Sequence, residues 1–370
     1  MNLGLMFQTV TVLACAGGLV AEERGDAHAF NELGVTYFKQ ARYEDARQAY
    51  ERALQLDPDA APTLANLATL YRTLGRNDEA EPLFMRALAI DERAFGPESS
   101  EVAGLQTSLA LLYAEEGRQR DAEKLLRTAL ATRERLLCQT DPAVALVLNN
   151  LAEVYRTEGK LEQAQSENVR ALRVFERALG PDDPQVATGL NNLASIYEAR
   201  RRYDDAELLF RRALDISLKA LGPTHPDVAV EWNNLGRVAK HRGDFRGAAE
   251  LYRKALAIWQ ASLGPEHPRV GYAWFNLAMS YAALQDYTQA GPMFEQARGI
   301  LEKHPGDFRA LAACLDGHAR MLRKTGKKKE ASRLEARARQ LRELHPGEET
   351  ARRYSVDVHD LEEALQSKEP

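Results

Sequence analysis

Residues 149–190 read NNLAEVYRTEGKLEQAQSENVRALRVFERALGPDDPQVATGL, and residues 191–232 read NNLASIYEARRRYDDAELLFRRALDISLKALGPTHPDVAVEW. Aligned without gaps, the two stretches share Asn-Asn-Leu-Ala at the start, a Tyr six residues after the first Asn, and Leu-Gly-Pro near the end. A fixed period of this length is the signature of a repeat architecture. The fold is therefore decided by this unit.

The same unit can be followed along most of the chain. Its Leu-Ala-x-x-Tyr motif recurs with a constant 42-residue period and ends at Tyr71, Tyr113, Tyr155, Tyr197 and, after two further periods, Tyr281. Leu235-Gly236 fills the remaining interval, and an upstream motif ends at Tyr37, one shorter, 34-residue step before Tyr71. With a degenerate unit at the end, we expect about eight units, which start near residues 27, 61, 103, 145, 187, 229, 271 and 312.

Each unit predicts two amphipathic helices joined by a tight turn. Leu, Ala and Tyr at relative positions 0, 1 and 4 lie on one face of a helix. Two small residues follow the Tyr, for example Ala164 and Ala171, with a bulky and usually aromatic residue between them; Asn168 is the exception. Glycine tolerates the left-handed conformation that ends a helix. The turn often contains one, at Gly75, Gly117, Gly159 and Gly243.

A Leu-Gly-Pro connector ends the second helix of several units. Glycine supplies a positive φ after the last helical residue, and the proline that follows cannot continue the helix. Cys138 stands one 42-residue period before Gly180, where glycine is expected. A residue with a Cβ avoids that conformation, so we expect this connector to be distorted.

The pattern resembles the tetratricopeptide repeat, a helix–turn–helix unit of about 34 residues. The first unit matches its signature at Phe30, Leu33, Gly34, Tyr37, Ala46, Tyr50, Ala53 and Pro58. The 42-residue units are similar to the variant of kinesin light chains and bacterial relatives, whose connector reads Leu-Gly-Pro…His-Pro…Val, as in residues 221–228. The resemblance implies an all-α fold, a right-handed superhelical solenoid of about eight repeats over residues 27–346.

Motifs of the common enzyme and metal chemistries are absent from the sequence. It contains no G-x-x-x-x-G-K, H-E-x-x-H, C-x-x-C or G-x-S-x-G. His225 and His267 lie one period apart in equivalent connectors, where a recurring helix-entry turn competes with a metal site. Neighbouring repeats are spaced on the order of 10 Å, too far for one ion. We therefore predict no enzyme activity, no cofactor and no metal.

The two ends of the chain differ from the repeats. Residues 1–21 carry no charged side chain, which predicts a signal peptide or membrane anchor within residues 1–26, with Cys15 as a candidate for lipidation. No positive charge precedes this run, and polar residues interrupt it, so an apolar helix packed on the first repeat is the alternative. Export and a cytoplasmic location both stay open. Residues 347–370 are acidic and predict a solvated tail.

In the family, partner peptides lie in a concave groove lined by the first helix of every unit. We number the Leu of each Leu-Ala pair as position 7. Positions 4, 7, 8 and 11 then face the core, and positions 2, 5, 9, 12 and 13 point roughly the opposite way. Position 5 and position 6, at the groove edge, hold two rows of asparagines: Asn149, Asn191 and Asn233, and Asn150, Asn192, Asn234 and Asn276.

These asparagines are the candidate binding residues. Amide side chains offer donors and acceptors, which suit the backbone of an extended peptide. The pattern is similar to the groove of kinesin light chains. The alternative is structural, with each Asn bonded to an adjacent helix or loop.

Charged and apolar groove positions predict selectivity. Arg156, Arg237 and Lys240 favour acidic groups, and Tyr272 and Phe275 offer an apolar site in the seventh unit. We expect a partner segment with acidic groups beside an aromatic or large aliphatic anchor. The basic residues could instead form a solvated face, and the eighth unit could cover the two rings.

The leading function is a non-catalytic scaffold that binds a protein segment in its groove. An envelope-associated assembly or export factor is the alternative, and it depends on residues 1–21. Nucleic-acid binding through the basic eighth unit is weaker, because the lysines and arginines there lack interleaved aromatics and the whole chain has a net charge of −5.

Overall fold

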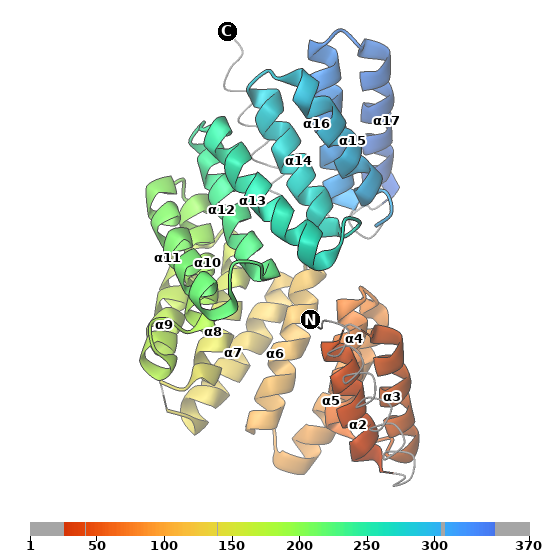
Figure 1. Cartoon of the computed structure of the whole chain (residues 1–370). Helices are drawn as coiled ribbons and strands as arrows, with labels where there is room; N and C mark the ends of the chain where they lie inside the picture. Colours follow the sequence, from red (N-terminus) through yellow and green to blue (C-terminus); the bar gives the residue numbers. More distant parts are fainter. Residues whose placement is uncertain (1–25, 41, 139, 305–307, 345–370) are drawn as a thin grey trace, which may run out of the picture. The chain divides into compact units, whose positions relative to one another are not determined.

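The computed structural model describes residues 26–40, 42–138, 140–304 and 308–344. In these ranges the chain forms 16 α-helices and no β-strand (Figure 1). The expected all-α class is confirmed. The predictions for residues 1–25 and 345–370 lie outside the described residues.

The helices form eight successive pairs, which we call repeats 1–8. The chain divides into two compact units after residue 139. The first unit holds repeats 1–3: α2 (Ala27–Lys39) with α3 (Tyr43–Leu56), α4 (Ala61–Thr73) with α5 (Asn77–Phe95), and α6 (Ser100–Glu115) with α7 (Gln119–Leu136). The second unit holds repeats 4–8: α8 (Pro142–Thr157) with α9 (Leu161–Leu179), α10 (Pro184–Ala199) with α11 (Tyr203–Leu221), α12 (Pro226–His241) with α13 (Phe245–Leu263), α14 (Pro268–Ala283) with α15 (Tyr287–Leu301), and α16 (Phe308–Lys324) with α17 (Lys328–Leu344).

Within each unit, a second helix contacts its own first helix and the first helix of the next repeat. In the second unit, for example, α9 contacts α8 and α10, and α13 contacts α12 and α14. Each repeat thus depends on its neighbour to bury its apolar face. The predicted solenoid of helix–turn–helix repeats is confirmed.

The connectors begin the first helices slightly earlier than the predicted unit starts. Four of these helices have a proline at their first position: Pro142, Pro184, Pro226 and Pro268. Proline is pre-organised for that position. Each of these helices begins three residues before its predicted unit start at 145, 187, 229 or 271. The preceding side chain caps the helix. His225 and His267 accept backbone N–H bonds through Nδ1, 3.2 Å from Asp227 N and Arg269 N respectively. These two histidines are therefore helix caps.

The connector at Cys138 differs from the others. The glycines that end α5, α9, α11 and α13 have φ between 81° and 93°. Helix α7 ends at Leu136 instead, and its cap residue, Leu137, is extended with φ −115°. A chain that lacks the glycine leaves the helix through the extended region, which accepts any residue.

The turns inside the repeats also need a positive φ. Glycine supplies it in five repeats, and Arg201 and Gln285 adopt φ of 58° and 61° in repeats 5 and 7. The geometry of the turn is kept although a side chain there costs about 1–2 kcal/mol.

The two helices of repeats 1 and 6 pack tightly against each other at position 8. A Cβ at Gly236 would lie 2.7 Å from Cε1 of Tyr252, and a Cβ at Gly34 would lie 2.5 Å from Cε1 of Tyr50. Repeats 1 and 6 therefore combine glycine with tyrosine. Repeats 2, 5 and 7 combine alanine with phenylalanine at the same two places: Ala68 with Phe84, Ala194 with Phe210, and Ala278 with Phe294.

This contact predicts the effect of a single methyl group. Gly236→Ala should lower the free energy of unfolding by about 1–3 kcal/mol, because the added carbon overpacks the Tyr252 ring. Adding Tyr252→Phe should recover part of the loss, because that pair occurs in other repeats. Urea denaturation measures both changes.

Gly299→Ala is the matched control. Gly299 lies inside α15, and a Cβ there would meet no atom within 4 Å. We expect this variant to be at least as stable as the wild type. Equal stability of Gly236→Ala and the wild type would contradict the contact.

Candidate functional site

The candidate residues lie on the first helices of repeats 4–7, α8, α10, α12 and α14. The side chains of the position-5 asparagines form hydrogen bonds either with the next repeat or with the second helix of their own repeat. Asn233 Oδ1 accepts from Asn276 Nδ2 at 3.0 Å, across repeats 6 and 7. Asn149 Oδ1 accepts from Asn168 Nδ2 at 2.8 Å, inside repeat 4. Asn191 Nδ2 donates to Glu231 Oε1. At this position each asparagine therefore bonds another helix of the stack.

The position-6 asparagines fall into two groups. Asn276 donates to Asn233, as described, and Asn66 donates to Asn31 in the same way at 2.9 Å in the first unit. The second group has no side-chain hydrogen-bond partner in the described part of the chain: Asn150, Asn192 and Asn234. Asn150 and Asn192 are half-buried, and Asn234 is more deeply placed.

The first two candidate cations are paired inside the chain. Arg156 forms an ion pair with Glu153 on the same helix, at 2.5 Å. Arg237 on α12 forms two hydrogen bonds of 2.7 Å with the Glu198 carboxylate on α10, and both side chains are 7% exposed. His241 Nε2 lies 3.5 Å from Glu198 Oε1. Lys240 is half-buried in the last turn of α12. The basic side of the groove is thus largely compensated by its own carboxylates.

Tyr272 and Phe275 are core residues. Their exposed fractions are 6% and 1%, and they belong to one apolar cluster with residues of α15 and α16. The Phe275 and Phe294 rings lie 6.3 Å apart, centroid to centroid. The eighth repeat covers both rings, which corrects the expectation that they line an open groove. Their positions agree with the alternative expectation, in which the eighth unit covers the two rings.

Sequence reasoning missed two features of this surface. Position 2, one turn before the free asparagines, carries a row of apolar and methyl-bearing side chains, Leu146, Thr188 and Val230, and Leu146 is 47% exposed. Glu231, at position 3 of repeat 6, is buried where other repeats have Val147, Gly189 and Ala273. The 42-residue alignment contained both signals, since the row recurs at position 2 of three repeats and Glu231 differs from the equivalent residues at position 3.

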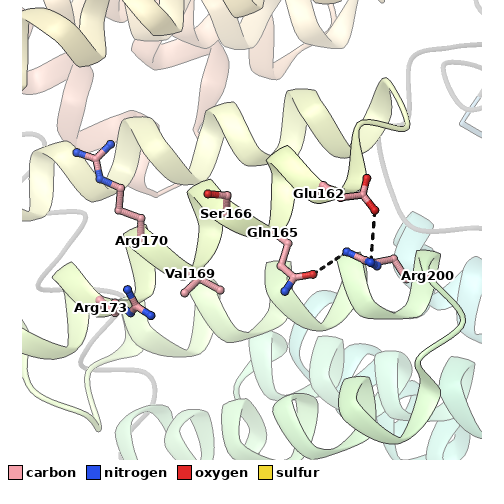
Figure 2. A pocket seen from close by; sticks show the side chains of 7 residues that line it. All are labelled: Glu162, Gln165, Ser166, Val169, Arg170, Arg173 and Arg200. Atoms are coloured by element: carbon pink, nitrogen blue, oxygen red, sulfur yellow. Dashed lines mark hydrogen bonds and ion pairs between the residues drawn. The ribbon is translucent and has the colours of Figure 1, made fainter.

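A separate depression of about 500 Å³ lies on the second helix of repeat 4, α9 (Figure 2). Arg200, from the end of α10, donates to Gln165 at 2.8 Å and pairs with Glu162 at 3.4 Å. The remaining lining residues are Ser166, Val169, Arg170 and Arg173. None of the candidate asparagines lines this depression, so it is distinct from the groove.

The described residues hold little that indicates another kind of site. Within them, no three His, Cys, Asp or Glu side chains are grouped as a metal site would require. Cys314 is buried, and burial raises the pKa of its thiol. None of the helices described has both the length and the apolar character needed to cross a bilayer.

Comparison with known families agrees with the repeat pattern. A family model described as Tetratricopeptide repeat matches residues 59–135, 143–219, 187–261, 227–303 and 269–343. A second model of the same description matches residues 27–60. Together they cover most of the chain.

Individual proteins are similar over shorter stretches. The crystal structure of BtubC (BKLC) from P. vanneervenii is 28% identical with a TM-score of 0.50, over 60% of this chain and 91% of that chain. A Podosopora anserina protein described as a putative kinesin light chain with nearly identical TPR-like repeats is 25% identical with a TM-score of 0.48, over 55% of this chain and 96% of that chain. Uncharacterized protein ycf37 of Pyropia yezoensis is 34% identical over 65 residues, which span 18% of this chain and 36% of that protein.

The buried ion pair between repeats 5 and 6 yields a prediction. Glu198→Gln leaves the Arg237 guanidinium buried without its carboxylate, and breaking such a pair costs about 3–5 kcal/mol. The free energy of unfolding should fall by that amount in denaturant titrations. Asp59→Asn is the control, since the Arg86–Asp59 pair is exposed and should contribute at most about 1 kcal/mol. If both variants lost a similar free energy of unfolding, the buried pair would not be more important to stability than the exposed one, which would contradict the prediction.

Proposed function

The chain belongs to the tetratricopeptide-repeat family, of the kinesin-light-chain-like kind, and on this basis we propose that it is a non-catalytic scaffold that binds an extended segment of a partner protein. The binding surface is the row of first helices in repeats 4–6. The observation that carries this proposal is the set of unused amides at position 6.

Asn150, Asn192 and Asn234 occupy equivalent places on α8, α10 and α12, one period apart. Each has an amide that the chain does not use for its own hydrogen bonds in the described residues. First helices of neighbouring repeats are spaced on the order of 10 Å, and an extended segment advances about 3.3 Å per residue. One amide would therefore meet the segment at roughly every third residue.

An amide contacts a peptide backbone with both a donor and an acceptor. Such recognition tolerates many partner sequences, so selectivity has to come from neighbouring side chains. The apolar row at position 2 lies one turn away, and its exposed member, Leu146, suits an aliphatic or aromatic anchor. We propose this row as the apolar site for the anchor, in place of Tyr272 and Phe275, which are buried.

The proposed acidic character of the partner has less support than the anchor. Arg156 and Arg237 are paired with Glu153 and Glu198, so a partner carboxylate would compete with an existing ion pair. Lys240, half-buried in the last turn of α12, also interacts within the chain. An acidic group is therefore a secondary feature of the proposed segment.

The other two functions have little in the described residues to favour them. The envelope-associated alternative depends on residues 1–21, which lie outside that range. In the eighth repeat, Arg323 pairs with Glu335 and Arg342 pairs with Asp316, which lowers the positive charge available to a nucleic acid.

Peptide display on the full chain tests the binding proposal. A random library should yield one enriched motif on the wild type, with an aliphatic or aromatic residue. The triple variant Asn150→Ala, Asn192→Ala and Asn234→Ala should bind the selected peptide at least about tenfold more weakly, since each lost hydrogen bond contributes about 0.5–1.5 kcal/mol. Calorimetry measures the affinity.

Asn276→Ala is the matched control, because its amide is already bonded to Asn233. It should lower thermal stability and leave the peptide affinity near the wild-type value while the protein is folded. No enriched motif, or equal affinity of the triple variant and the wild type, would exclude this groove as the binding site.

A further inference from the structure

Glu231 occupies a place in repeat 6 that other repeats give to small or apolar residues. It is 3% exposed and lies on the side of α12 that meets α10 of repeat 5, where Asn191 donates to its Oε1. A carboxyl group at such a site loses its hydration, and the loss disfavours the ionised form.

The hydrogen bonding around this carboxyl is incomplete for an ionised group. Glu231 Oε2 and Asn191 Oδ1 are both buried, and neither has a hydrogen-bond partner in the described residues. A carboxylate can only accept hydrogen bonds, and so can the amide oxygen. One hydrogen bond already joins the two side chains, from Asn191 Nδ2 to Glu231 Oε1. A hydrogen bond between the two remaining oxygens, Glu231 Oε2 and Asn191 Oδ1, requires one further proton. Exchanging Oδ1 and Nδ2 of Asn191 would leave the same deficit of one donor.

We propose that Glu231 is a neutral carboxylic acid in the folded protein, and that its Oε2–H donates to Asn191 Oδ1. The acid and the amide then form a pair with two hydrogen bonds between repeats 5 and 6. This pair is a pH-sensitive contact in the stack, and it does not depend on the proposed peptide binding.

The surrounding charges agree with a neutral acid. The pKa of the Glu231 carboxyl is raised to about 8: burial is the largest cause, the Asn191 hydrogen bond acts in the opposite direction, and Asp227 on the same helix adds to the rise. Other charged groups of this interface are paired with one another: Glu198 on α10 with Arg237 and His241 on α12, and Asp204 and Glu207 on α11 with Arg242 at the end of α12. On the adjoining helices, Tyr203 of α11 stacks on His241 and Tyr252 of α13 is fully buried.

The sign of the pH effect follows from the direction of this shift. The pKa of the folded state lies above the ordinary value of 4.5. The stabilisation is therefore complete below about pH 4.5 and is lost as the pH rises to about 8, because the unfolded chain releases its proton first. Above that range the pair holds an ionised carboxylate and only one hydrogen bond.

Comparison of the full-length wild type with Glu231→Gln tests the proposal. The Gln side chain has the shape of the acid and supplies a permanent N–H donor, so it reproduces both hydrogen bonds without a titrating group. Urea denaturation between about pH 5 and pH 9 gives the folding constants. The ratio of the wild-type constant to the Gln constant should fall roughly tenfold per pH unit up to about pH 8 and then become constant.

A second measurement works on the wild type alone. Carbon NMR of protein labelled at its glutamate carboxyls should show one carboxyl that titrates near pH 8, and Glu231→Gln should remove that signal. Asn191→Ala, introduced into both backgrounds, should cost the Gln protein the same at every pH, whereas its cost in the wild type should change as the carboxyl ionises near pH 8. A pH-independent folding ratio, or the absence of a carboxyl that titrates above about pH 6, would overturn the proposal.

Discussion

The close approach of two helices at one small residue is the contact on which most of the repeats depend. In repeats 1 and 6 the space between the helices is filled by a tyrosine ring against a bare Cα, and a Cβ there would overlap the ring. Alanine with phenylalanine gives an equivalent fit in other repeats. The second helix also contacts the first helix of the next repeat. The apolar core continues through these shared contacts.

The fold could be predicted because its determinants recur at a constant spacing. The Leu-Ala-x-x-Tyr motif, the paired alanines and the connector glycines each act within one repeat, so a single sequence shows them several times. Where a repeat departs from the pattern, the sequence indicated that the local structure would change, but it did not indicate which conformation would result. Cys138 indicated an altered connector, while the extended conformation of Leu137 depends on how the last turn of α7 ends. Arg201 and Gln285 show that the turn geometry persists where its preferred residue is missing.

The candidate site was harder to predict, because its hydrogen bonds cross from one repeat to the next. The asparagines at position 5 look alike in sequence. Asn149 bonds Asn168 because repeat 4 has no aromatic ring at that place, and Asn191 bonds Glu231 because repeat 6 has a carboxyl where its neighbours have none. Which amide remains unused therefore depends on residues 19 to 43 positions away. The burial of Phe275 likewise depends on α16, which no local pattern around residue 275 reveals.

The ion pair between Glu198 and Arg237 bears on how similar repeats avoid stacking in the wrong order. Apolar contacts between such repeats are nearly interchangeable, so an unfolded chain could dock repeat 6 onto the wrong neighbour. If repeat 6 were placed directly on repeat 4, position 12 would present Arg156 in place of Glu198, and Arg237 would meet another guanidinium. Burying two like charges is far more costly than burying the matched pair. This polar contact therefore favours the correct order among faces that apolar packing alone would hardly distinguish.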